Sequence, residues 1–106
     1  MNDIKLMNKA ADNIRILAAS MVEKAKSGHP GGAMGGADFV NVLFSEFLVY
    51  DPKNPAWEGR DRYFQDPGHM SPMLYSVLAL AGKFTIDELK EFRQWGSVTP
   101  GHPEVN

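Results

Sequence analysis

Cysteine is absent from the 106 residues, so the chain has no disulfide, no thiolate metal ligand and no cysteine nucleophile. Neither sign of charge dominates, because 11 Lys and Arg face 13 Asp and Glu and leave a formal charge of −2. Such a balance argues against a nucleic-acid partner. No apolar run approaches the roughly 18 residues of a membrane-spanning helix, and the first residues lack the apolar core of a signal peptide. We therefore expect a cytoplasmic protein that binds neither nucleic acid nor membrane.

The composition that remains is that of an ordinary globular domain. The chain is 43% hydrophobic and 23% charged, and its length suits one domain. Hydrophobic residues recur at helical spacing in four segments: residues 3–26, 37–48, 70–81, and a stretch from Thr85 to near Trp95. The last of these starts at a capping box formed by Thr85 and Glu88. In the first, three residues widen the apolar surface beyond one stripe and predict burial on more than one side: Ile4, Ile16 and Val22.

Residues 62–65 are the one strand candidate, ended by Asp66-Pro67-Gly68. A single strand cannot satisfy its own backbone groups, so its neighbours are expected to lie outside these 106 residues. The sequence thus predicts a mostly helical piece with one or two short strands. The expected core consists of Phe39, Phe44, Phe47, Leu74, Leu78 and Trp95, whereas Trp57 and Tyr63 are expected either in the core or against a subunit partner.

Each of the three histidines follows a glycine, as Gly28-His29, Gly68-His69 and Gly101-His102, and each pair falls in a break between predicted helices. Glycine allows a sharp turn or a close approach to a ligand, and an imidazole gains or loses a proton near neutral pH. The repeated pairing indicates a polar, glycine-lined cleft for an oxygen-rich ligand. Two other interpretations are surface-loop histidines beside helix caps and a three-histidine zinc site. The zinc site is disfavoured because no two histidines share a helix face, and we expect no stoichiometric zinc.

The glycine-rich segment 31–36 precedes the second predicted helix. Backbone N–H groups at such a position favour anions such as phosphate. The segment matches neither a P-loop nor a dinucleotide fingerprint, so close packing of the second helix against a neighbour is the favoured interpretation.

Four motifs occur in order: Ser27-Gly28-His29-Pro30-Gly31, Arg60-Asp61-Arg62, Gly68-His69-Met70-Ser71 and Thr99-Pro100-Gly101-His102-Pro103-Glu104. Together they resemble the start of a transketolase, a thiamine-diphosphate enzyme, and the likeness extends over nearly the whole chain. The last motif separates transketolases from deoxyxylulose-phosphate synthases and keto-acid dehydrogenases. The resemblance implies an α/β fold, with residues 1–106 forming part of the N-terminal, diphosphate-binding domain.

The resemblance also implies an activity, namely transfer of a two-carbon ketol group from a ketose phosphate to an aldose phosphate in the pentose phosphate pathway. Thiamine diphosphate and Mg²⁺ are the implied cofactors, sugar phosphates the implied substrates, and a cytoplasmic homodimer the implied assembly. His29 and His102 are implied as catalytic and substrate-binding residues. His69 is implied as a cofactor-binding residue.

Two departures qualify these expectations. Asp66-Pro67 stands where the family usually has Ser-Asn, and this adds a negative charge and removes a backbone donor before His69. The Gly-Asp-Gly…Asn metal motif and the glutamate that activates the cofactor are not among these residues. The isolated chain is therefore expected to be inactive without a longer chain or a complementing C-terminal chain. The alternative is a catalytically inactive fragment or a small interaction module.

Overall fold

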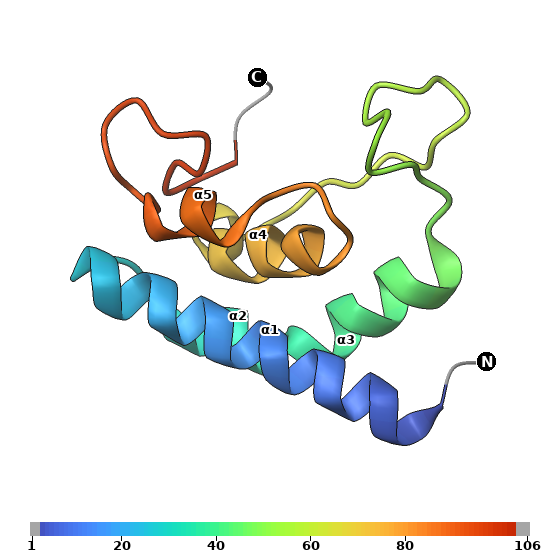
Figure 1. Cartoon of the computed structure of the whole chain (residues 1–106), viewed down its shortest axis with the longest axis horizontal. Helices are drawn as coiled ribbons and strands as arrows, with labels where there is room; N and C mark the ends of the chain where they lie inside the picture. The colour runs from blue at the N-terminus through green and yellow to red at the C-terminus, as the bar shows by residue number, and fades with distance from the viewer. Residues whose placement is uncertain (1–2, 104–106) are drawn as a thin grey trace.

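The computed structural model describes residues 3–103. Its regular secondary structure consists of five α-helices and two short turns of other helix types. The α-helices are α1 (Ile4–Ala25), α2 (Pro30–Gly35), α3 (Ala37–Val42), α4 (Ser71–Leu80) and α5 (Ile86–Lys90). A π-helical turn η1 (Leu43–Phe47) extends α3, and a 3₁₀ turn η2 (Gly68–Met70) precedes α4. The long α1 lies along one side and contacts each of the other four α-helices (Figure 1). No described helix is long and apolar enough to cross a membrane.

The first predicted helix is confirmed almost to the residue. The Asp3 carboxylate caps α1 by accepting from the N–H groups of Lys5 and Leu6, at 2.7 and 3.3 Å. The helix ends where Lys26 takes a left-handed conformation at φ 54°. Burial on several sides is wrong, because α1 buries only the face formed by Ala11, Ile14, Ala18 and Met21.

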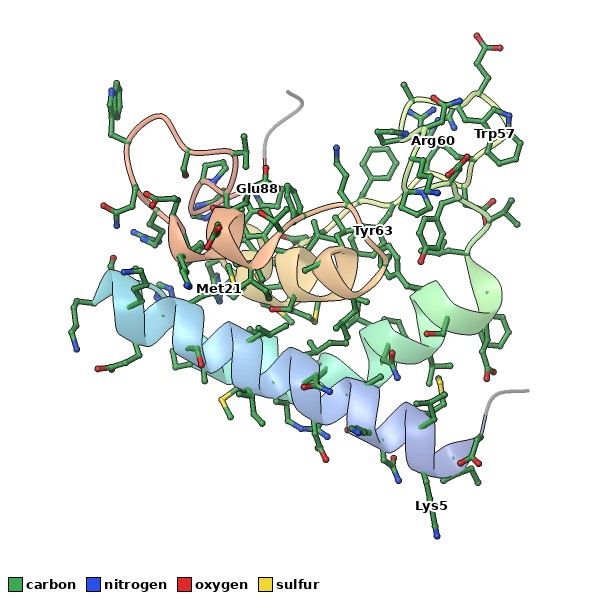
Figure 2. All side chains as sticks on the ribbon, viewed as in Figure 1. Lys5, Met21, Trp57, Arg60, Tyr63 and Glu88 are labelled. Carbon is green, nitrogen blue, oxygen red and sulfur yellow. The ribbon has the colours of Figure 1, made fainter. Side chains whose placement is uncertain are left out.

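The opposite side of α1 faces solvent. Ile4 is 72% exposed and Ile16 is 64% exposed. Figure 2 shows Met21 directed from α1 toward the helices above it and Lys5 directed away from them. The other helices lie on one side of α1 only, which leaves Ile4 and Ile16 in solvent, whereas Val22 is half-buried and packs against Met21, Tyr75, Leu89 and Phe92.

The glycine-rich segment is helical rather than a loop. A Cβ on Gly32 would lie 2.8 Å from Cγ of Met70, and a Cβ on Gly36 would lie 2.6 Å from the sulfur of Met73. These glycines let α2 and the start of α3 approach η2 and α4 closely, as the packing interpretation predicts. The helix predicted over 37–48 follows as α3 and η1.

The core consists of two clusters. Ile14, Val40, Phe44 and Met73 belong to the larger one, and Leu74, Leu78 and Tyr63 pack against it half-buried. The smaller one contains Met21, Tyr75, Leu89 and Phe92. The prediction of a buried Phe44 is confirmed. Three others are wrong, since Phe39 and Phe47 are each 69% exposed and Trp95 is fully exposed; Trp57 is 43% exposed.

Residues 62–65 do not form a strand. They have no regular secondary structure, and no strand occurs anywhere among residues 3–103. A strand needs a hydrogen-bonded neighbour, and this segment has none in the described part of the chain. The α/β expectation is therefore confirmed only as a mostly helical piece, and its one or two short strands are not present here.

The helix at the capping box is shorter than predicted. The Thr85 hydroxyl accepts from the N–H of Glu88 at 3.1 Å, and the Glu88 carboxylate accepts from the N–H of Thr85 at 2.9 Å. This confirms the start, but α5 ends at Lys90 rather than near Trp95. Arg93 has a left-handed backbone at φ 62°, and its N–H donates to the carbonyl of Thr99 at 3.0 Å. The chain therefore turns back instead of continuing as a helix.

Candidate functional site

Three turns present the three histidines. His29 immediately precedes α2, His69 lies in η2 just before α4, and His102 follows the loop after α5. The rings of His29 and His69 have centroids 4.6 Å apart and are tilted by 52°. A Cβ on Gly68 would lie 2.6 Å from Cδ2 of His102, so the third ring lies against the same turn. The structure thus brings together all three predicted site residues.

Glycine is required at two of these turns for different reasons. Gly28 has φ 116°, a conformation that side chains rarely adopt. Its position is also close to a core residue, since an added Cβ would lie 3.2 Å from the Phe92 ring. Gly68 has no such φ, and what it provides is space for the ring of His102. This convergence favours a shared cleft over three unrelated surface histidines.

Buried hydroxyl groups hold the third turn in place. Ser71 Oγ donates to the carbonyl of Gly101 at 2.6 Å, and the Tyr75 hydroxyl donates to the carbonyl of Pro100 at 2.5 Å. Thr99 Oγ1 donates to the carbonyl of Glu88 at 3.0 Å. The side chains of Ser71, Tyr75 and Thr99 are almost completely buried. The segment before His102 is therefore tied to α4 and to α5.

Sequence reasoning missed these anchoring residues as part of the site. Ser71 and Thr99 belong to the quoted motifs, so their place beside histidines was a signal that they serve the same turn. No motif marked Tyr75, because in the sequence it is one more residue of a helix that is mostly apolar.

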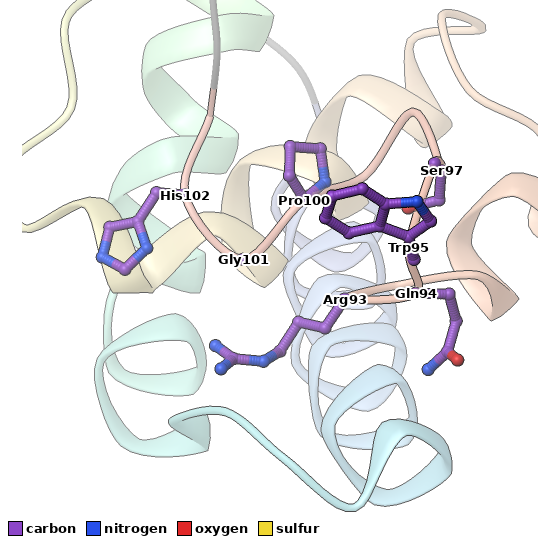
Figure 3. A pocket seen from close by; sticks show the side chains of 8 residues that line it. Arg93, Gln94, Trp95, Ser97, Pro100, Gly101 and His102 are labelled. Atoms are coloured by element: carbon purple, nitrogen blue, oxygen red, sulfur yellow. The ribbon is translucent and has the colours of Figure 1, made fainter.

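Open space adjoins His102. A cavity of about 770 Å³ is lined by residues of the loop after α5 and by the third turn: Arg93, Gln94, Trp95, Gly96, Ser97, Pro100, Gly101 and His102 (Figure 3). The rings of His29 and His102 are exposed, and His69 is half-buried. A space of this size accommodates a ligand of sugar-phosphate dimensions.

The chemistry available here is that of imidazoles. They donate and accept hydrogen bonds and transfer protons. No group of three or more His, Asp or Glu side chains able to hold a metal ion occurs among residues 3–103. Asp66 is exposed on the turn before His69 and has no ion-pair partner in the described part of the chain.

Comparisons of the sequence with a family model and with curated proteins all match transketolases. Residues 6–106 match the family model described as "Transketolase, thiamine diphosphate binding domain". The chain is 54% identical over 101 residues to a transketolase of Buchnera aphidicola, covering 94% of this chain and 15% of that protein. It is 52% identical over 96 residues to transketolase 1 of Escherichia coli K12, covering 90% of this chain and 14% of that protein.

Solved structures agree. A transketolase structure from Campylobacter jejuni superposes with a TM-score of 0.90 at 46% identity, over 98% of this chain and 16% of that one. The transketolase from Leishmania mexicana gives a TM-score of 0.89 at 47% identity, over 92% of this chain and 15% of that one. The chain therefore spans between 14% and 16% of the length of these relatives.

Proposed function

Since this chain belongs to the transketolase family, we propose that it forms the N-terminal part of a transketolase active site. The reaction is transfer of a two-carbon ketol group from a ketose phosphate to an aldose phosphate. The observation that carries the proposal is the meeting of three glycine-borne imidazoles from turns far apart in the sequence. A cavity large enough for a sugar phosphate is lined by one of them, His102.

His29 and His102 are proposed as the residues that contact the substrate. Both rings are exposed, and each follows a glycine turn whose backbone is held from behind by buried residues. An imidazole beside a sugar hydroxyl can donate a hydrogen bond to its oxygen, and it can accept the proton when the hydroxyl ionises. Fixing the two rings by their turns also orients the sugar for reaction.

His69 is proposed as a cofactor-binding residue. Thiamine diphosphate, when bound, supplies the electron sink that stabilises the two-carbon unit. The half-buried ring of His69, next to that of His29, fits a role as a hydrogen-bond donor to a diphosphate. Asp66 fits less well, because a carboxylate near a diphosphate repels it. Mg²⁺ is proposed to take its ligands from other parts of the enzyme, since the described residues hold no metal-ligating cluster.

Exposed aromatic residues support a larger assembly. Phe39 and Phe47 are each 69% exposed, and Phe64 is 88% exposed. Phe39 and Phe64 line one groove together with Leu43 and Leu48, and an exposed apolar patch of this kind marks a surface of contact with another segment or chain. We propose that further transketolase sequence, a partner subunit of a homodimer or a complementing C-terminal chain covers them, and that the assembly acts on cytoplasmic sugar phosphates of the pentose phosphate pathway.

A chimaeric enzyme tests the function directly. Residues 1–106 replace the matching segment of the E. coli transketolase, and ketol transfer is measured with and without His29→Ala or His102→Ala. We expect an active chimaera that loses most of its kcat/KM in either variant, about 10²–10⁴-fold for a lost proton-transfer group. Lys5→Ala, at an exposed position on the far side of α1, is the control and is expected to be neutral. A well-folded but inactive chimaera, or full activity without both histidines, would refute the proposal.

A second candidate is that the 106 residues by themselves are an inactive fragment or a small interaction module. The absence of a metal-ligating cluster among residues 3–103 favours it for the isolated chain. Calorimetry of the purified chain with thiamine diphosphate and magnesium is expected to show no binding. Tight binding would contradict this candidate and leave the first one intact.

A further inference from the structure

Arg93 lies between two of the three histidine turns. It follows α5 and has a left-handed backbone at φ 62°, which is uncommon for a residue with a side chain. Its N–H donates to the carbonyl of Thr99, which closes the loop that leads to His102. The backbone of this residue therefore helps to shape the third turn.

The side chain of Arg93 reaches both turns. Its Cδ lies 3.6 Å from the position of a Cβ on Gly28, so the aliphatic stem passes the first turn. Its Nη1 lies 2.9 Å from the position of a Cβ on Gly101, so the guanidinium rests against the third turn. Figure 3 shows the side chain extending from the loop toward Gly101, whereas Gln94 points away from it.

Among residues 3–103 no carboxylate lies within 4.0 Å of the Arg93 guanidinium, whereas Arg15 is paired with both Asp12 and Asp38. The contacts that the described residues give Arg93 are those of its stem and of its planar head with the two glycine turns. Both glycines are the residues immediately before a site histidine.

We propose that Arg93 is a positioning residue that keeps the turns of His29 and His102 at a fixed separation. The stem supports Gly28, and the guanidinium supports Gly101. The placement of the two turns is a property of this chain alone. Its relevance to catalysis rests on the proposed function.

Three substitutions test this by NMR on the full 106-residue chain. The reporters are the cross-peaks between the His29 and His69 rings and between the His102 ring and Gly68. Arg93→Gly removes the side chain while suiting the left-handed backbone, so the fold is expected to persist. Arg93→Lys keeps a stem but lacks the planar head. Lys90→Ala removes an exposed positive charge three residues earlier and is the matched control.

The expected result is graded. Arg93→Gly loses both cross-peaks while the melting temperature and the signals of α1 stay unchanged. Arg93→Lys retains the His29–His69 cross-peak and loses the His102–Gly68 cross-peak, and Lys90→Ala retains both. If Arg93→Gly retains both cross-peaks, the proposal is overturned.

Two further readouts separate positioning from other roles. Titration of the unmodified chain with inorganic phosphate is expected to leave the backbone signals of Gly28 and Gly101 in place. A saturable shift of these signals that Arg93→Gly abolishes, with both cross-peaks intact in that variant, would assign Arg93 as an anion ligand and overturn the positioning role. In the chimaera, Arg93→Gly is expected to lower kcat as well as raise KM, with partial recovery in Arg93→Lys. Unchanged kinetics in the Arg93→Gly chimaera would overturn the positioning role. The NMR test needs neither cofactor nor turnover, so a chimaera that is inactive for other reasons leaves the NMR result valid.

Discussion

The histidine turns (residues 27–30, 67–71 and 99–103) and the loop of residues 50–65 all lie at or beyond the ends of helices, yet they are stabilised differently. The turns are held by contacts between segments far apart in the sequence, such as Ser71 to Gly101 and Tyr75 to Pro100. Hydrogen bonds of the 50–65 loop are mostly local, for example from Arg60 to the carbonyls of Ala56 and Trp57. The loop also extends away from the helices in Figure 1. The end of the molecule that carries the histidine turns (the site end) is thus held by hydrogen bonds between distant segments, whereas the end that carries the 50–65 loop (the loop end) is held mostly by local ones.

The largest test of this difference compares two phenylalanines. Phe92 is 1% exposed and contacts the first turn, whereas Phe64 is 88% exposed. Phe92→Ala is expected to reduce the free energy of unfolding by about 3–5 kcal/mol. Phe64→Ala is expected to change it by less than about 0.5 kcal/mol. Urea denaturation of both variants measures this, and equal effects would show that the loop end is as well packed as the site end.

The next test removes one buried hydroxyl group from the site end and one exposed hydroxyl group from α1. Ser71→Ala leaves the buried carbonyl of Gly101 without its donor and is expected to cost about 1–3 kcal/mol. Ser20→Ala, at an exposed position on α1, is the control and is expected to lie within about 0.5 kcal/mol of the unmodified chain. A neutral Ser71→Ala in the same denaturation assay would mean that the third turn does not depend on α4.

The third test compares a glycine that lies against a histidine ring with a glycine that has open space beside it. Gly68→Ala places a methyl group where the His102 ring lies, so the ring must move, and a loss of about 1 kcal/mol or less is expected because a side chain can shift. Gly35→Ala meets nothing within 4 Å and is expected to be neutral or stabilising by up to about 1 kcal/mol. Thermal melting and the His102 ring signals distinguish the two, and an unmoved ring in Gly68→Ala would contradict the placement.

The smallest expected effect belongs to the loop end and depends on pH. Burial raises the pKa of Tyr63 and of Tyr50 above the ordinary value. The folded chain therefore holds these phenolic protons more tightly than the unfolded chain, and stability is lost as pH rises above about 10. Denaturation between about pH 9 and 11 is expected to show a shallower loss for Tyr63→Phe. An unchanged slope would show that this phenol is as well solvated in the folded state as in the unfolded one.

Local signals predicted the starts of α1 and α5 correctly but missed α2, and the distribution of apolar residues predicted burial less well. The Thr85–Glu88 capping box acts over one turn of chain, so it is present whatever surrounds it. Phe39 and Phe47 were assigned to the core from hydrophobicity alone, yet both are mostly exposed. Burial depends on which face of a helix meets another element, and hydrophobicity alone does not specify that face.

The candidate site was only partly predictable, because some of its residues carry a local signal and others do not. Three Gly-His pairs are visible in the sequence, and the structure places the rings of His29 and His69 side by side and that of His102 against the turn that carries His69. Their catalytic and cofactor-binding roles remain predictions. Tyr75 and Arg93 were not assigned to the site, because nothing within a few residues of either one marks a contact with Pro100 or Gly28.

What the sequence alone determined is therefore local: where α1 and α5 start, and where glycine and histidine stand together in the turns between helices. Each of these depends on a few neighbouring residues. The tertiary structure decided that α1 buries a single face, that α5 ends at Lys90, and that Ser71, Tyr75 and Arg93 support the histidine turns. Such outcomes require contacts between segments that only the folded backbone brings together.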